Sequence, residues 1–326
     1  MDEKKDWTKL LEFGVGSLSV SGCMFILLVF FCYRKLRNFS FECVAYLTFS
    51  SMLTTISYMI NYIDEEDHLK AHTKKCIAQA FMMVFLENSQ YIWAMLIAYY
   101  INQAVIFFED YHKRSHKSTR IKFLIVGYLV PLSLALVAMW RDVYGPSGRW
   151  CWIDTKDNKT ENKVFSFFFY FLIWFLIFLN FMFNVKVMKY LNRQILTERE
   201  KEILNRYYKK MMIYPIIQII CILPGSINRF LQIFFNKDIF ELQMIQMAFN
   251  MIQGFLYAIV YGYTYQVRKA LHKTFQNICG CCFYVNRSSS VSTVDSQTLN
   301  ERSYSNVSSD GSFDHHYSTR QDISVP

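Results

Sequence analysis

Hydrophobic residues in this chain are gathered into long blocks, which short polar segments separate. Residues 13–33 and 43–63, for example, contain no charged side chain. A hydrocarbon core about 30 Å thick is spanned by about 20 residues of α-helix, because each residue rises about 1.5 Å. Seven blocks reach that length, so we predict membrane helices over 10–33, 41–63, 76–108, 121–140, 164–192, 207–235 and 239–265.

This pattern predicts an all-α membrane protein, a bundle of seven transmembrane helices. Helices suit the bilayer because they satisfy their own backbone hydrogen bonds where no water is present. The composition agrees, since 53% of the residues are hydrophobic and only 19% are charged. Around the bundle, 10–265, we expect an outer N-terminus over 1–9, an amphipathic surface helix over 266–283 and a polar tail over 284–326.

The distribution of charge predicts the orientation of the bundle. The chain has 35 Lys and Arg against 26 Asp and Glu, a net charge of +9. Most basic residues fall in or beside the loops on one side, such as the region 186–210, whereas the acidic run 64–67 falls on the other side. Basic loops stay in the cytoplasm. We therefore expect a multi-pass protein of the cell membrane with an extracellular N-terminus and a cytoplasmic C-terminus. Nucleic acid is not an expected partner, because the basic residues border helices instead of forming one face.

Two of the nine cysteines, Cys76 and Cys151, fall on the outer side in this topology. That compartment is oxidising, so we predict a disulfide from the third helix to the second outer loop; two free thiols are the alternative. Four more fall inside predicted helices, where they are expected to act as small packing residues: Cys23, Cys32, Cys43 and Cys221.

The segment after the seventh helix predicts an amphipathic helix on the inner membrane surface. Val267, Leu271 and Phe275 recur at helical spacing, and Arg268 and Lys269 occupy other faces. Basic residues in such a helix are attracted to anionic membrane lipids. A frayed extension of the seventh helix is the alternative.

Several residues outside the bundle are expected modification sites. Cys279, Cys281 and Cys282 lie next to the membrane, which favours palmitoylation over a zinc site, because no further Cys or His pair stands nearby at ligand spacing. Asn158 begins the sequon Asn-Lys-Thr in an outer loop and is expected to carry glycan. The tail after residue 284 lacks apolar periodicity, so it is expected to be disordered. Its candidate phosphorylation sites are Ser288, Ser289, Ser290, Ser292, Thr293, Ser308 and Ser309.

Motifs of enzymes are absent from the sequence, including HExxH, GxSxG and the phosphate-binding glycine loops. The chain is therefore not expected to be an enzyme, and neither a cofactor nor a metal is expected. A retinal protein would need a lysine in the seventh helix, and residues 242–267 contain none. Seven spans also do not divide into two equal inverted repeats, which weakens the case for a transporter.

Several motifs of the chain resemble the slime-mould cyclic AMP receptor family. The shared features are a tryptophan-rich cysteine loop after the fourth helix, proline positions in the sixth helix and paired glycine motifs in the seventh. These motifs are Tyr144-Gly145-Pro146, Trp150-Cys151-Trp152-Ile153, Tyr214-Pro215, Pro224, Asn228-Arg229, Gln253-Gly254 and Tyr261-Gly262. The chain is also distantly similar to secretin-type receptors. That class is less favoured, because no large cysteine-rich ectodomain precedes the first helix.

The resemblance implies a G-protein-coupled receptor. Such a receptor senses an extracellular small-molecule ligand, here cyclic AMP or a related molecule, and activates a heterotrimeric G protein. The implied partners of the tail are a receptor kinase and an arrestin-like protein, and the alternative to this role is an inert linker. A seven-helix transporter or channel is the alternative function.

Charged and aromatic residues near the outer side are candidate ligand contacts. Glu87 is costly inside a membrane unless it meets a ligand, pairs with Arg229 or contacts Asn88 or Gln90. Arg229 suits a carboxylate or phosphate, or it could snorkel to outer water. The tryptophans could stack on a base or simply pack, and the remaining cations could be solvated loop charges. The candidate set is Glu87, Arg141, Arg149, Trp150, Trp152, Arg229 and Lys237.

Overall fold

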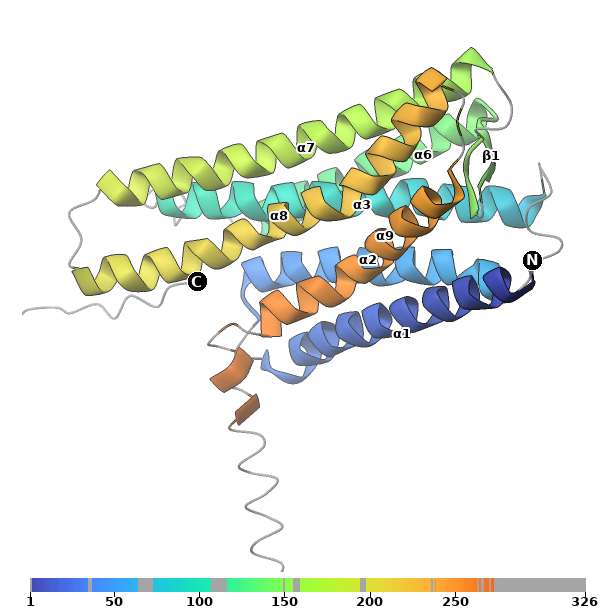
Figure 1. Ribbon diagram of the computed structural model, residues 1–326. Helices are drawn as coiled ribbons and strands as arrows, with labels where there is room; N and C mark the ends of the chain where they lie inside the picture. Colours follow the sequence, from blue (N-terminus) through green and yellow to red (C-terminus); the bar gives the residue numbers. More distant parts are fainter. Residues whose placement is uncertain are drawn as a thin grey trace, which may run out of the picture. The chain divides into compact units, whose positions relative to one another are not determined.

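The computed structural model describes residues 2–34, 37–63, 73–106, 116–148, 150–154, 159–193, 198–235, 237, 239–262, 264, 267–269 and 271–272. Within them, seven helical segments are long and apolar enough to cross a membrane (Figure 1). The first three are α1 (Asp2–Cys32), α2 (Phe39–Ile63) and α3 (Lys74–Ile106). The fourth runs without a break through α5 (His116–Leu124), the π-helical turn η2 (Ile125–Leu129) and α6 (Val130–Trp140). The last three are α7 (Thr160–Arg193), α8 (Glu198–Phe235) and α9 (Phe240–Gly262).

The helices form a closed ring within one compact unit, Met1–Arg268. Contacts run from α1 to α2, α2 to α3, α3 to α7, α7 to α8, α8 to α9 and back from α9 to α1. Helix α3 also contacts α6, α8 and both strands of a hairpin, so it is the central helix of the bundle. The predicted seven-helix bundle is confirmed.

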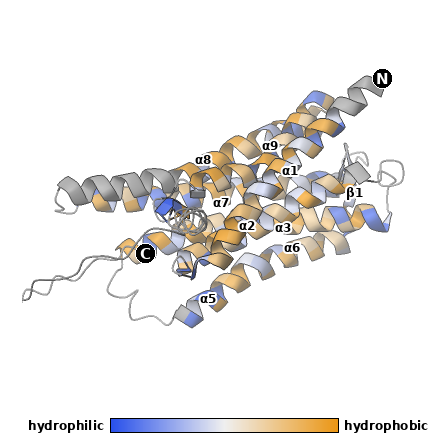
Figure 2. Cartoon of the chain, turned by 90° about the horizontal axis from the view of Figure 1, so that it is seen from below, coloured by the Kyte–Doolittle hydropathy of each residue, from blue (hydrophilic) through white to orange (hydrophobic). Residues whose placement is uncertain are grey.

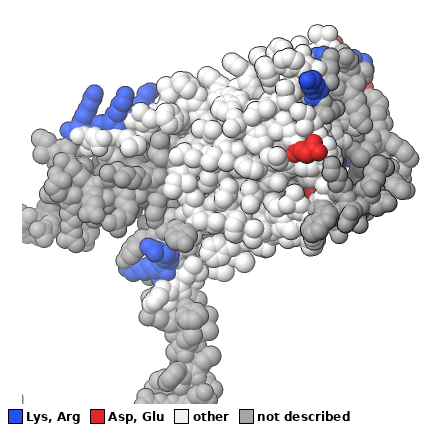
Figure 3. All heavy atoms as spheres, in the orientation of Figure 1, with Lys and Arg blue, Asp and Glu red and all other residues white. Residues whose placement is uncertain are grey.

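Polar and apolar side chains are distributed as a membrane requires. Hydrophobic residues dominate the helix surfaces, and hydrophilic ones gather toward the helix ends (Figure 2). On the face in Figure 3, Lys and Arg lie at both ends, with a broad band between that has neither. Phenylalanines of α7 such as Phe167, Phe171 and Phe178 are exposed, whereas Asn180 and Asn184 of the same helix are buried. The apolar exterior is thus the surface that faces lipid.

A short antiparallel hairpin closes one end of the bundle, where α1 begins (Figure 1). Strand β1 (Tyr144–Ser147) pairs with β2 (Trp150–Ile153) in a register that sets Gly145 opposite Trp152. The turn needs Gly148, whose φ of 80° lies in the left-handed region that glycine adopts without strain. The Tyr144 hydroxyl donates to the Ala135 carbonyl at 2.8 Å, and burial raises the pKa of this phenol. Tyr144 therefore remains a neutral donor that ties the hairpin to α6.

Close helix approach leaves no room for a side chain at Gly127 and Gly254. A Cβ on Gly127, in η2, would lie 2.5 Å from the Trp93 ring of α3. A Cβ on Gly254, in α9, would lie 2.5 Å from Cys23 Sγ and 2.6 Å from Ser19 Oγ of α1. Small residues let membrane helices approach closely, because packing substitutes there for the hydrophobic effect.

The structure adds several features to the predicted elements. Helices α1 and α8 begin earlier than residues 10 and 207, and α9 ends at Gly262 instead of 265. The hairpin and η2 were not predicted.

Among the four cysteines predicted to pack inside helices, Cys32 is exposed, so the packing role expected for it is wrong; the other three are buried. Of the predicted surface helix 266–283, only 267–269 and 271–272 are described, and these are helical. Asn158, the Cys279 cluster and the tail lie outside the described residues.

Candidate functional site

Arg229 occupies a buried position in α8, near the hairpin end of the bundle. Its side chain is 2% exposed, so it does not snorkel to outer water. The guanidinium carbon lies 4.5 Å from the Trp152 ring centroid, a cation–π contact with the hairpin. One terminal nitrogen donates to Gln232 Oε1 at 2.6 Å, while Nε has no hydrogen-bond partner. The charge is therefore held by the Trp152 ring, the Gln232 amide and the Tyr170 hydroxyl.

Trp152 is positioned by the anchored hairpin. A disulfide joins Cys151 to Cys76 of α3, with the Cα atoms 5.2 Å apart, which confirms the predicted pairing. The Cys151 backbone N–H also donates to Gln79 Oε1 of α3 at 3.1 Å. With β2 fixed in this way, the Trp152 ring packs edge-on against Phe169 of α7, at 4.9 Å between centroids. The indole Nε1 of Trp152 has no hydrogen-bond partner.

Glu87 of α3 is held by a tyrosine hydroxyl from α2. The Tyr58 hydroxyl donates to Glu87 Oε1 at 2.8 Å and accepts from Asn250 Nδ2 of α9 at 3.0 Å. The Tyr58 ring meets Trp150 edge-on at 5.8 Å between centroids. One hydroxyl thus connects three helices, and its ring supports the hairpin. The direct partner of Glu87 is neither Asn88 nor Gln90.

A second polar chain links the helices beside Arg229. Asn228 Nδ2 of α8 donates to Gln246 Oε1 of α9 at 2.8 Å, and Gln246 Nε2 donates to the Tyr170 hydroxyl of α7 at 3.3 Å. Tyr170 also packs edge-on against Trp152, at 5.9 Å between centroids. The side-chain oxygen of Asn228 has no hydrogen-bond partner. We refer to Arg229, Trp152, Asn228, Gln246 and Tyr170 as the outer polar site.

The structure brings together some of the predicted ligand residues and leaves others apart. Arg229 and Trp152 are in direct contact, and Trp150 and Glu87 both contact Tyr58. No ion pair within 4.0 Å joins Glu87 to Arg229, both of which are described residues. Arg141 instead pairs with Glu161 at 2.8 Å, half exposed. The side chain of Lys237 is exposed, and Arg149 lies outside the described residues.

Sequence reasoning missed the uncharged members of these polar chains. Tyr58, Tyr170 and Gln246 carry no charge, so each alone resembles an ordinary residue of an apolar helix. A signal was nevertheless present in α9. Its polar residues Gln243, Gln246, Asn250 and Gln253 recur at spacings of three and four, which places them on one helix face.

The outer polar site contains buried polar groups that have no hydrogen-bond partner. Trp152 Nε1 and Arg229 Nε are buried donors without partners, and Asn228 Oδ1 is a buried acceptor without one. Each such group costs about 1–3 kcal/mol unless a ligand or water satisfies it. The site therefore offers a cation and two donors, which suit an anion, and an aromatic face. Within the described residues, no group of three His, Cys, Asp or Glu side chains is placed to hold a metal ion.

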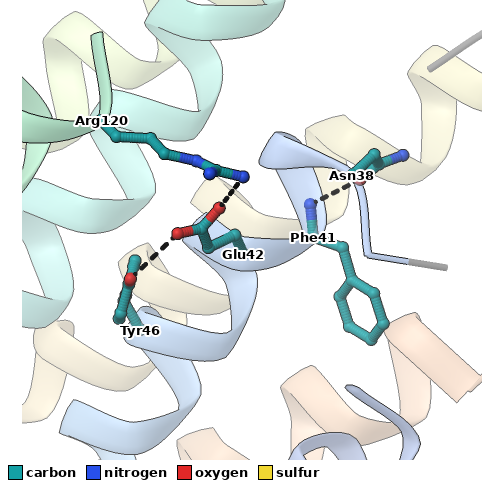
Figure 4. Close-up of polar contacts among 5 residues, drawn as sticks. All are labelled: Asn38, Phe41, Glu42, Tyr46 and Arg120. Atoms are coloured by element: carbon teal, nitrogen blue, oxygen red, sulfur yellow. Dashed lines mark hydrogen bonds and ion pairs between the residues drawn. The ribbon is translucent and has the colours of Figure 1, made fainter. Parts of the chain in front are cut away.

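The opposite end of the bundle contains an ion pair between α2 and α5 (Figure 4). An Arg120 terminal nitrogen lies 2.8 Å from Glu42 Oε2, and the Tyr46 hydroxyl donates to Glu42 Oε1 at 3.0 Å. The Asn38 side-chain oxygen accepts from the Phe41 N–H at 2.8 Å, so Asn38 caps the start of α2. The Tyr46 ring then packs on Trp93, at 4.8 Å between centroids. This end is thus connected to the central helix.

The seven helices define a multi-pass membrane protein, and comparison with known proteins identifies its class. Residues 8–257 match the family model described as 7 transmembrane receptor (Secretin family). The chain therefore belongs to the secretin-type family of seven-transmembrane receptors. The sequence alone favoured this class less, and the family match corrects that preference.

Curated relatives support the resemblance drawn from the loop and helix motifs. The chain is 25% identical to the cyclic AMP receptor-like protein A of Dictyostelium discoideum over 249 residues, 76% of this chain and 62% of that relative. It is 26% identical to the G-protein coupled receptor 1 of Arabidopsis thaliana over 274 residues, 81% of this chain and 80% of that relative. The chain thus spans less than two thirds of the Dictyostelium protein. The predicted membership of the cyclic AMP receptor-like group is confirmed.

Proposed function

We propose that this protein is a G-protein-coupled receptor that binds a small extracellular ligand in the outer polar site and activates a heterotrimeric G protein. The observation that carries this proposal is the buried contact between Arg229 and Trp152, with unpaired donors on both side chains. A buried cation in a membrane protein is costly and usually serves function. Membership of a receptor family supports the same conclusion.

The chemistry of the site favours a ligand that joins an anion to an aromatic ring. The Arg229 guanidinium and the Trp152 N–H would bind phosphate oxygens, and the aromatic side chains would stack on a base. The names of the relatives direct the first probe to cyclic AMP, which has both features. Glu87 is positioned through Tyr58 instead and would sense the ligand only indirectly.

Signal transfer would use α8, which contains Pro215 and Pro224. Each proline removes one helical hydrogen bond, and Figure 1 shows α8 changing direction along its length. A ligand shifts a conformational equilibrium only if it binds one state better. Because Asn228 and Arg229 lie in α8 beyond Pro224, ligand contacts there would favour one bend of the helix and so open its other end to the G protein.

The proposal also covers the orientation of the chain and its modifications. The N-terminus is extracellular and the C-terminus cytoplasmic, with glycan on Asn158. Acyl groups on the Cys279, Cys281 and Cys282 cluster hold the amphipathic helix at the inner leaflet. A receptor kinase phosphorylates the tail, and the phosphates bind an arrestin-like protein. Loss of a glycosidase-sensitive mass shift in Asn158→Gln would support this orientation.

The test of the proposal is guanine-nucleotide exchange. The full-length receptor is placed in lipid nanodiscs with a heterotrimeric G protein, and exchange is measured with and without cyclic AMP. We expect cyclic AMP to accelerate exchange, and Arg229→Lys to lose most of this effect while Arg141→Lys retains it. A receptor that neither accelerates exchange nor binds the nucleotide-free heterotrimer would overturn receptor function. Basal exchange without a cyclic AMP response would overturn only the ligand class.

A further inference from the structure

A groove opens between α6 and α7 on the lipid-facing side of the bundle. Its volume is about 340 Å³, within the range of small-molecule sites. Both helices pack on α3 and make little direct contact with each other, so α3 forms the floor of the groove. Leu134 and Val137 line one wall, and Phe168 and Leu172 line the other. Val137 and Phe168 are about half exposed, so the groove is open to the bilayer.

One buried polar side chain lies among these apolar residues. Asn88 of α3 lines the groove and is 1% exposed. Its amide nitrogen donates to the Val84 carbonyl at 2.8 Å, but its side-chain oxygen has no partner. The other polar residue of the lining, Ser133, already donates to the Val130 carbonyl at 2.7 Å. The groove therefore offers one unsatisfied acceptor in an otherwise apolar setting.

We propose that this groove binds a membrane sterol, whose single hydroxyl donates to the Asn88 side-chain oxygen. The groove opens to hydrocarbon, where an unpaired acceptor finds no water. Its lining contains no charged residue, so burying the charged headgroup of a phospholipid there would be costly. A sterol supplies one uncharged donor on an apolar body. Its rigid rings lose less conformational freedom on binding than an acyl chain does.

The sterol site is distinct from the outer polar site but shares a wall with it. Phe169 lines the groove and packs on Trp152, with the ring centroids 4.9 Å apart. Ile153 of β2, the residue after Trp152, also lines the groove. A bound sterol would therefore support the hairpin from the lipid side. Sterol binding can be measured without a receptor ligand, so its test does not depend on the proposed function.

The experiment uses the full-length receptor in phospholipid nanodiscs with a photoactivatable sterol that keeps its free hydroxyl. We expect labelling of α6 and α7 peptides that line the groove. Leu134→Trp fills the groove and should reduce labelling at least about fivefold, which corresponds to a loss of about 1 kcal/mol of binding free energy. Leu136→Trp is the matched control, because Leu136 is exposed on the same helix and does not line the groove. Equal labelling in the two variants would overturn the site.

The hydroxyl contact is tested from both partners. Asn88→Leu should weaken labelling about fivefold or more. If that variant does not fold, competition on the unaltered receptor gives the same information, because the sterol methyl ether lacks the donor and should compete about fivefold less well than the free sterol. Equal competition by sterol and ether would overturn the role of Asn88. Equal or better competition by a long-chain alcohol or a diacylglycerol would overturn the assignment to sterol.

Discussion

The Arg229 guanidinium carbon lies 4.5 Å from the centre of the Trp152 ring, so a charge carried by α8 is held against an aromatic ring carried by the outer hairpin. Both side chains are almost fully buried. The hairpin is fastened to α3 by the disulfide at Cys151, whereas α8 contains two prolines. This contact therefore joins an outer element anchored by a disulfide to a helix that contains two prolines.

Replacement of Arg229 and Trp152 should reveal direct energetic coupling. We expect Arg229→Gln and Trp152→Leu each to lower the thermal stability of the purified receptor. The double variant should lose less stability than the sum of the two single losses. The coupling should be about 0.5–2 kcal/mol, the range of buried cation–π contacts. A double-mutant cycle on Arg141 and Glu161, which form an exposed ion pair, should give a coupling energy of about 1 kcal/mol or less. Additive effects at Arg229 and Trp152 would show that the contact contributes nothing.

The Tyr58 hydroxyl should make a large contribution to the stability of the receptor. Tyr58→Phe keeps the ring against Trp150 but removes the donor to Glu87 and the acceptor for Asn250. Buried groups left without partners cost about 1–3 kcal/mol, so unfolding should occur at a lower temperature. Tyr128→Phe is the comparison variant, because its hydroxyl contacts the Tyr46 carbonyl at 3.5 Å and the Ser50 and Trp93 side chains, none of which carries a charge. Its loss should therefore lower the unfolding temperature less than Tyr58→Phe does.

The same hydroxyl can be tested by compensation. If Glu87 is the main group that loses its partner in Tyr58→Phe, Glu87→Leu should lower the free energy of unfolding much less in the Tyr58→Phe variant than in the unaltered receptor. Thermal unfolding of the four variants measures this difference. Equal costs of Glu87→Leu in the two backgrounds would contradict the direct bond.

Gly127 should tolerate no side chain. Gly127→Ala places a methyl group 2.5 Å from the Trp93 ring, which is fully buried, so we expect a loss of about 1–3 kcal/mol from overpacking. Gly14→Ala is the control, because a Cβ there meets nothing within 4 Å and alanine favours a helix. Surface expression and thermal stability should therefore fall for the first variant and stay level or rise for the second.

The Arg120–Glu42 pair should affect signalling more than stability. The Arg120 side chain is 48% exposed, and exposed pairs contribute about 0.2–1 kcal/mol, so Arg120→Ala should unfold almost normally. Because the pair joins α5 to α2 at the proposed G-protein face, its loss should alter basal nucleotide exchange. The swap Arg120→Glu with Glu42→Arg should restore exchange toward the original rate. Unchanged exchange in Arg120→Ala would remove this role.

The sequence predicted the features that depend on local composition. Seven apolar blocks identified the helices, because the need to cross a bilayer acts on each segment separately. Topology alone paired Cys76 with Cys151. The contact of Arg229 with Trp152 was not predictable in this way, because it depends on how α8 packs beside the hairpin. Direct pairing of Glu87 with Arg229 was considered from charge alone, yet the structure gives Glu87 a tyrosine partner from α2. The π-helical turn was also missed; it contains Gly127, which packs against Trp93 of α3, and the sequence does not show such a contact between helices.

Close packing at Gly254 limits which helices can move. The α9 backbone at this position lies so near Cys23 and Ser19 of α1 that even a methyl group would collide with them. Because the two helices meet here without room for a methyl group, we expect α9 and α1 to move together when the receptor changes conformation. The conformational change on activation would then involve the helices on the other side of the bundle. A probe on α1 and a probe on α9 should therefore keep a constant separation in the resting and the active receptor.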